Sequence, residues 1–129
     1  MRYVPLIALL LLVSVSFKAH AEFVPDTKEK VNQLVDAIYK AEGGEKTIYP
    51  YGIRSINTHS NKAYARKICI NTVKNNVRRW RKAQSKGDKR SYLKFLGDRF
   101  CPPKAHKKNV NWLPNVRWFL KQHKQGIKG

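Results

Sequence analysis

The apolar residues between positions 31 and 41 recur at the three- and four-residue spacing of one helical face. They are Val31, Leu34, Val35, Ile38 and Ala41. Asp26 or Thr27 can cap such a helix, and Gly43 can take the left-handed conformation that ends it. The pattern therefore predicts an amphipathic helix that starts beside Thr27 and ends just before Gly43.

Three further helices are predicted by the same kind of spacing. The first runs from about 61 to 83, with Thr58 or Ser60 as its cap, and the second runs from 91 to about 99. The last begins at Leu113 or Pro114 and ends at position 123, and Pro114 suits a first turn. No run alternates long enough to require a strand, so we expect a small all-α fold of about four helices.

Residues 1–21 have the composition of a secretory signal peptide. Arg2 supplies the positive start, an apolar run covers 6–15, and Ala19-His20-Ala21 fits a cleavage site. The run is too short for a comfortable membrane span, although an uncleaved anchor is the alternative. We therefore expect one exported domain, residues 22–129, which is periplasmic or secreted, and we expect it to be a monomer.

The chain has 27 Lys and Arg against 8 Asp and Glu, a formal charge of +19. Such an excess predicts a polyanionic partner, such as a cell-wall polymer, an anionic lipid surface or extracellular DNA. The alternative is a basic surface that only aids solubility. The basic cluster 78–82 (Arg-Arg-Trp-Arg-Lys) has the composition of nucleic-acid grooves, but a solvated helix end with one buried ring is the commoner explanation.

Cys69 and Cys101 are the two cysteines of the chain. In an oxidising compartment they predict one disulfide bond, and the alternative is a buried helix residue plus an unpaired thiol. No histidine or cysteine spacing fits a metal site, and no phosphate-binding glycine loop is present. We therefore expect neither a metal nor a cofactor, which leaves carboxylate chemistry or binding alone.

Glu42 ends the apolar stripe of the first predicted helix. It follows Val31 by eleven residues, which places the two residues about 20° apart around the helix axis. Burial and the negative end of the helix dipole both favour a protonated carboxyl there, as a general acid requires. The alternative is a surface residue, with Ala41 as the last core position.

The loop 43–57 after this helix offers the aromatic side chains Tyr49 and Tyr51 on either side of Pro50. These rings can form the floor and wall of a groove that binds a sugar or a similar ligand. The alternative is a packed aromatic turn beneath the helix.

A helix that ends in Ala41-Glu42-Gly43-Gly44, followed by a loop with Tyr51-Gly52-Ile53, resembles the lysozyme-like superfamily. It is most similar to the soluble lytic transglycosylase branch. The resemblance covers 31 to about 56, and it implies that Glu42 is the sole catalytic acid and base. It also implies cleavage of the β-1,4 bond between N-acetylmuramic acid and N-acetylglucosamine in peptidoglycan. The family's Gly-Leu-Met-Gln is replaced here by Gly52-Ile53-Arg54-Ser55.

On this resemblance we expect an exported peptidoglycan-cleaving enzyme. Most glycosidases need two carboxylates, and the nearest other candidate along the chain is Glu45, with Asp88 and Asp98 far away. A single acid suits a transglycosylase. The residues expected to contact substrate are Tyr49, Tyr51, Gly52, Ile53 and Trp112. The alternative function is an exported basic protein that binds cell-wall polymer or DNA without catalysis.

Overall fold

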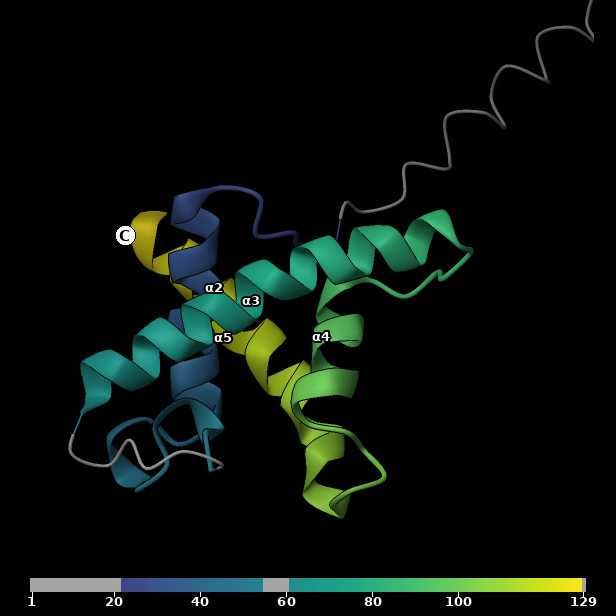
Figure 1. Cartoon of the computed structure of the whole chain (residues 1–129). Helices are drawn as coiled ribbons and strands as arrows, with labels where there is room; N and C mark the ends of the chain where they lie inside the picture. The colour runs from purple at the N-terminus through teal and green to yellow at the C-terminus, as the bar shows by residue number, and fades with distance from the viewer. Residues whose placement is uncertain (1–21, 55–60, 129) are drawn as a thin grey trace, which may run out of the picture.

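The computed structural model describes residues 22–54 and 61–128 (Figure 1). This part of the chain contains four α-helices and no strand, which confirms the all-α prediction. The helices are α2 Lys28–Ala41, α3 Lys62–Ser85, α4 Tyr92–Phe100 and α5 Trp112–Lys128. Three short 3-10 helices join them: η1 Gly44–Lys46, η2 Pro50–Gly52 and η3 Lys107–Asn111. The predicted signal segment and the caps Thr58 and Ser60 lie outside the described residues.

Side-chain caps fix where three of the helices begin. Of the two caps that the sequence allowed, Asp26 and Thr27, it is the Thr27 hydroxyl that accepts a hydrogen bond from the Lys30 amide, at 3.1 Å. Asn61 caps α3 by accepting from the Tyr64 amide at 2.9 Å, and Ser91 caps α4 by accepting from the Lys94 amide at 3.2 Å. The last helix begins at Trp112, directly after η3, and ends at Lys128, beyond the predicted end at position 123.

Helix α2 lies at the centre of the fold and packs against both α3 and α5 (Figure 1). The long helix α3 crosses α2, and the short helix α4 packs between α3 and α5. The turn η2 contacts α2 and α3, so the described part of the predicted loop, residues 43–54, folds back onto the end of the first helix. This return brings Glu42 and Gly52 together.

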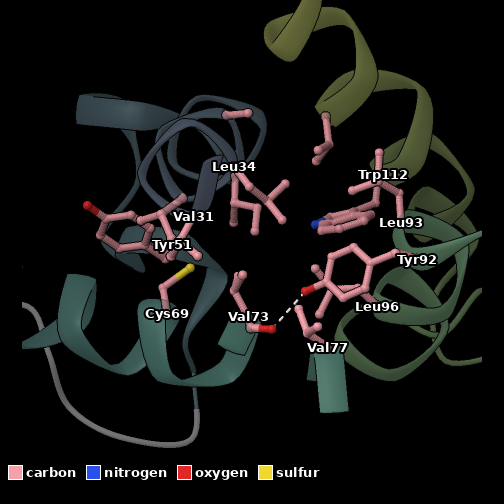
Figure 2. Packing of buried hydrophobic residues seen from close by; sticks show 14 of the residues in the cluster. Val31, Leu34, Tyr51, Cys69, Val73, Val77, Tyr92, Leu93, Leu96 and Trp112 are labelled. Atoms are coloured by element: carbon pink, nitrogen blue, oxygen red, sulfur yellow. Dashed lines mark hydrogen bonds between the residues drawn. The ribbon is translucent and has the colours of Figure 1, made fainter. Parts of the chain in front are cut away.

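The core is built from the apolar stripe of α2 and the facing sides of the other helices (Figure 2). Leu34, Val35 and Ile38 are completely buried, and each such side chain stabilises the fold by roughly 1.5–3 kcal/mol. A buried hydrogen bond ties α4 to α3, because the Tyr92 hydroxyl donates to the Val73 carbonyl at 2.8 Å (Figure 2).

Cys69 and Cys101 are free thiols, so the structure contains no disulfide between them. Cys69 is buried in α3 and Cys101 lies half-buried at the end of α4, which is the alternative arrangement named above. Burial raises the pKa of Cys69 to about 12 and that of Cys101 to about 11. Both side chains are therefore protonated near neutral pH and are poor nucleophiles.

The basic cluster 78–82 is a solvated helix end with one buried ring. Trp80 is buried, and its indole N–H donates to the Arg90 carbonyl at 2.9 Å. The four cations around it are exposed. Within the described residues, no helix combines the length and the apolar character needed to cross a membrane.

Candidate active site

Glu42 is the C-terminal cap of α2. Its amide donates to the Ile38 carbonyl at 2.9 Å, and its side chain is half-buried. Gly43 follows with φ +114°, in the left-handed region where glycine is favoured, and this ends the helix as predicted. The backbone thus holds the carboxyl group at the negative end of the helix dipole.

The turn η2 places the backbone of Gly52 directly against the Glu42 carboxylate. A Cβ added to Gly52 would lie 2.6 Å from Glu42 Oε2, so only glycine leaves room for this contact. Gly52 also has φ +72°, and Tyr51 before it has φ +61°, a conformation that a bulky residue adopts at a cost of roughly 1–3 kcal/mol. Burial of the Tyr51 ring, which is 2% exposed, offsets that strain.

Trp112 approaches Glu42 from the start of α5. Its indole N–H is buried, makes no well-formed hydrogen bond with a described residue, and lies close enough to Glu42 to lower the pKa of that carboxyl. In Figure 2 the indole nitrogen points into the interior, away from α4. The ring packs on Gly97 of α4, where an added Cβ would lie 3.0 Å from Trp112 Cε3.

Burial is the largest influence on the Glu42 carboxyl and raises its pKa. The Trp112 N–H and the positive charge of Arg54 both lower it, but the net result is a raised pKa. Glu42 forms no ion pair with any described residue. It therefore keeps its proton to a higher pH than an ordinary glutamate, as a general acid requires.

Most of the other acidic side chains are paired with cations. All eight acidic residues lie in the described part of the chain, and six of them form ion pairs at 2.6–3.3 Å. These are Glu22 with Arg117, Asp26 with Lys30, Asp36 with Arg66, Glu45 with Lys62, Asp88 with Arg90, and Asp98 with Arg90 and Lys94. The Glu29 carboxylate accepts a hydrogen bond from Gln33. Glu42 alone is both partly buried and without a cation.

Glu45 is held away from an acid–base role by its own partners. Its carboxylate accepts hydrogen bonds from Lys62 at 2.6 Å and from the Tyr39 hydroxyl, and these bonds lower its pKa. The Lys62 ammonium also lies 4.5 Å from the centre of the Tyr39 ring. The pKa of the Glu42 carboxyl is therefore raised and that of the Glu45 carboxyl is lowered, although only three positions separate the two residues.

Two cavities flank the neighbours of Glu42, and Glu42 itself lines neither. Trp112 and Cys101 line one cavity of about 340 Å³. Gly52 and Phe100 line the other, of about 300 Å³. Trp112 lines the first cavity and Phe100 the second, and the centroids of the two rings lie 6.0 Å apart.

The structure divides the predicted site residues into three sets. Glu42, Gly52 and Trp112 come together, although Trp112 is 5% exposed and offers little surface to a ligand. Tyr51 and Ile53 are buried in the core, so the packed aromatic turn named as the alternative describes the Tyr51 ring better than a groove wall does. Tyr49 is half-buried, with the Arg54 guanidinium 4.7 Å from its ring centre.

The sequence reasoning did not assign the polar residues of the 300 Å³ cavity to one site. Thr72, Asn76 and Arg79 lie on one face of α3, and their spacing of four and then three is a signal in the sequence. Arg99 of α4 also lines this cavity, and no local sequence pattern predicts that it lies near the three residues of α3. Among the described residues, no group of three or more His, Cys, Asp or Glu side chains has a geometry that would hold a metal ion.

Comparison with known proteins adds no relationship: no protein-family model, curated protein or solved structure matches this chain. The likeness to lysozyme-like enzymes therefore rests on the residues around Glu42.

Replacing Gly52 with alanine tests the contact between this turn and Glu42. The new Cβ would overlap the carboxylate, so we expect Gly52→Ala to unfold at lower urea concentration and to displace Glu42. Gly87→Ala is the matched control, because Gly87 has φ +100° and nothing within 4 Å of an added Cβ. The control should cost about 1 kcal/mol of unfolding free energy and Gly52→Ala about 2–4 kcal/mol. Equal losses of unfolding free energy in Gly52→Ala and Gly87→Ala would contradict the contact between Gly52 and Glu42.

Replacing Glu42 with glutamine should stabilise the protein at neutral pH. Because the pKa of Glu42 is raised on folding, the folded state binds this proton more tightly than the unfolded state. Wild-type stability therefore falls, relative to Glu42→Gln, as pH rises from about 4.5 through the folded pKa. The two proteins should be equally stable below pH ~4.

Thermal unfolding at pH 4 and at pH 7 measures this difference. The control is Glu45→Gln, which removes an exposed, ion-paired carboxylate of lowered pKa and should give no gain at pH 7. If Glu42→Gln raised the unfolding temperature by the same amount at both pH values, the raised pKa of Glu42 would be contradicted.

Proposed function

We propose that the protein is an exported peptidoglycan-cleaving enzyme of the lytic transglycosylase type, with Glu42 as its single catalytic acid and base. The observation that carries this proposal is the state of Glu42, which is half-buried, unpaired and raised in pKa. The predicted signal segment supports export to the periplasm or the cell exterior. The resemblance around Glu42-Gly43-Gly44 supplies the substrate class.

In the proposed reaction, protonated Glu42 donates its proton to the glycosidic oxygen as the bond to the muramyl C1 breaks. The resulting carboxylate then accepts the proton of the muramyl 6-hydroxyl, whose oxygen bonds to C1. The product is a 1,6-anhydro sugar, and Glu42 ends protonated again. A raised pKa helps the first step, because the acid is present at a higher pH.

The arrangement of carboxylates favours this internal attack over hydrolysis. An inverting hydrolase needs a second carboxylate about 6.5–9.5 Å away to activate water, and a retaining one needs a nucleophile at about 5–5.5 Å. Glu45 is the nearest acid along the chain, and it is exposed and paired with Lys62 and Tyr39. The internal hydroxyl makes a second carboxylate unnecessary.

A second candidate function is non-catalytic binding of an anionic polymer. A hollow of about 710 Å³ lies between the start of α2 and the middle of α3. Its walls combine apolar side chains with one acid, Asp26, and with the cations Lys28, Lys74, Arg78 and Arg81. This candidate predicts binding to wall polymer or DNA that weakens steeply with salt, and it predicts no effect of Glu42→Gln.

Digestion of purified peptidoglycan tests the proposal. Wild type and Glu45→Gln should release muropeptides with 1,6-anhydro ends, read by mass spectrometry, whereas Glu42→Gln should lose at least 100-fold in rate. Glu45→Gln removes the same charge three positions away and is the matched control. A digestible substrate is established with a reference muramidase.

Other outcomes would overturn parts of the proposal. Reducing-end products would contradict transglycosylation and indicate a hydrolase. Equal activity of wild type and Glu42→Gln would remove Glu42 from the mechanism. No release by any of the three proteins would contradict the enzyme and favour the binding protein.

Replacing Arg54 with glutamine should raise the pKa of Glu42. The Arg54 guanidinium is exposed, and its positive charge lowers that pKa. Without this charge, only the Trp112 N–H opposes the rise in pKa that burial causes. An NMR titration of ¹³C-labelled glutamate carboxyls should show the Glu42 signal moving to a higher midpoint. Arg78→Gln, on the other side of α3, should leave the midpoint unchanged. A lower midpoint in Arg54→Gln would contradict the site's electrostatics.

A further inference from the structure

The turn η2 is tied to its neighbours by one side chain of α3. Arg66 lies near the start of α3, and its nitrogen Nη1 donates to Asp36 of α2 at 2.7 Å and to the Tyr51 hydroxyl of η2 at 3.4 Å. Its other terminal nitrogen, Nη2, donates to Asn32 Oδ1 of α2 at 3.3 Å. A single guanidinium therefore connects α3, α2 and η2.

Tyr51 carries this connection to the backbone beside Glu42. Its ring is 2% exposed and packs 5.1 Å from the Tyr39 ring of α2. Its hydroxyl points away from the other labelled side chains in Figure 2 and accepts the hydrogen bond from Arg66. The next residue is Gly52, whose backbone lies against the Glu42 carboxylate. A movement of Tyr51 therefore moves the turn that covers this carboxylate.

The conformation of the turn needs support from its surroundings. Tyr51 has φ +61°, a strained backbone conformation that persists only where neighbouring contacts hold it. Packing of the ring fixes one end of the side chain, and the bond from Arg66 fixes the hydroxyl at the other end. The planar guanidinium fixes its partners in direction as well as in distance.

We propose that Arg66 is a positioning residue for Glu42: it holds Tyr51 from α3 and so keeps the Gly52 backbone against the Glu42 carboxylate. The catalytic meaning of this role rests on the proposed function, in which Glu42 is the acid and base. The hydrogen bonds of Arg66 go to α2 and η2, so its influence on Glu42 passes through the turn.

The direction in which the Glu42 pKa changes separates this role from a simple effect of charge. If the loss of Arg66 loosens the turn, water reaches the Glu42 carboxyl, and its raised pKa moves down toward the ordinary value. If Arg66 acted only as a nearby positive charge, its loss would raise that pKa.

Other groups face the same carboxyl and stay in place in this comparison. Among the described residues, those that interact electrostatically with it or donate a hydrogen bond to it are Trp112, Arg54, Cys69 and Cys101. Both thiols have raised pKa values and keep their protons through neutral pH. They therefore contribute no charge while Glu42 titrates.

An NMR titration of ¹³C-labelled glutamate carboxyls measures the direction of the change. The midpoint of Glu42 should fall in Arg66→Gln and also in Arg66→Lys, because lysine keeps the charge but lacks the planar fork. It should fall in Tyr51→Phe as well, which removes the hydroxyl, keeps the buried ring, and serves as the test if Arg66→Gln does not fold. The double variant Arg66→Gln/Tyr51→Phe should move the midpoint no further than Arg66→Gln alone, because both changes break one connection.

Arg117→Gln is the matched control. It removes the same charge from another partly exposed ion pair, with Glu22 at 3.2 Å, which does not involve η2. It should leave the Glu42 midpoint unchanged. An unchanged or raised midpoint in Arg66→Gln or in Tyr51→Phe would overturn the positioning role, as would an equal fall in Arg117→Gln.

Kinetics on soluble peptidoglycan fragments give a second measurement. Arg66→Gln and Tyr51→Phe should lower kcat by roughly tenfold or more and change KM by less than about twofold, because a misplaced acid affects the transition state more than substrate binding. A rise in KM with unchanged kcat would contradict a role in positioning Glu42.

The positioning role and the catalytic proposal can fail separately, because the NMR titration requires no substrate. A Glu42 midpoint that falls as predicted, in a protein that does not cleave peptidoglycan, would overturn the enzyme alone. Cleavage that depends on Glu42, with a midpoint that does not fall in Arg66→Gln, would overturn the positioning role alone.

Discussion

The contact between the Gly52 backbone and the Glu42 carboxylate is the constraint on which the site depends. It requires Tyr51 and Gly52 to adopt positive φ angles, and burial of the Tyr51 ring supplies the stabilisation that offsets the strain. Because the turn covers one side of Glu42 and Trp112 approaches another, the carboxyl loses part of its water and its pKa rises. The packing of a turn thus contributes to the raised pKa of this carboxyl.

Glu42 is the exception among the acidic residues of the protein. Six acids are paired with cations and a seventh accepts a hydrogen bond, so their ionised forms are stabilised near the surface. Glu42 has neither kind of compensation beyond the nearby Trp112 N–H and the charge of Arg54. Basic side chains remain in excess, and three of them meet at the cavity next to Gly52. Gly52 therefore links the two features, because its backbone contacts the Glu42 carboxylate and also lines this cavity.

The aromatic residues show where sequence reasoning reached its limit. Tyr51 was expected to line a groove, yet its ring packs in the core 5.1 Å from that of Tyr39. The disulfide expected between Cys69 and Cys101 is also absent. Cys69 points from α3 into the core of the protein, whereas Cys101 lies at the end of α4. Composition gives residue types, but it does not give the direction in which a turn presents them.

The sequence by itself determined the helices and the position of Glu42 at the end of one of them. Spacing, caps and breaker residues act over a few positions, so these features can be read locally. Only the tertiary structure decided that Gly52 and Trp112 would enclose Glu42, that Lys62 would neutralise Glu45, and that Arg79 and Arg99 would share a cavity. Those residues are brought together by the packing of separate helices, and the burial that tunes a carboxyl exists only once that packing has formed.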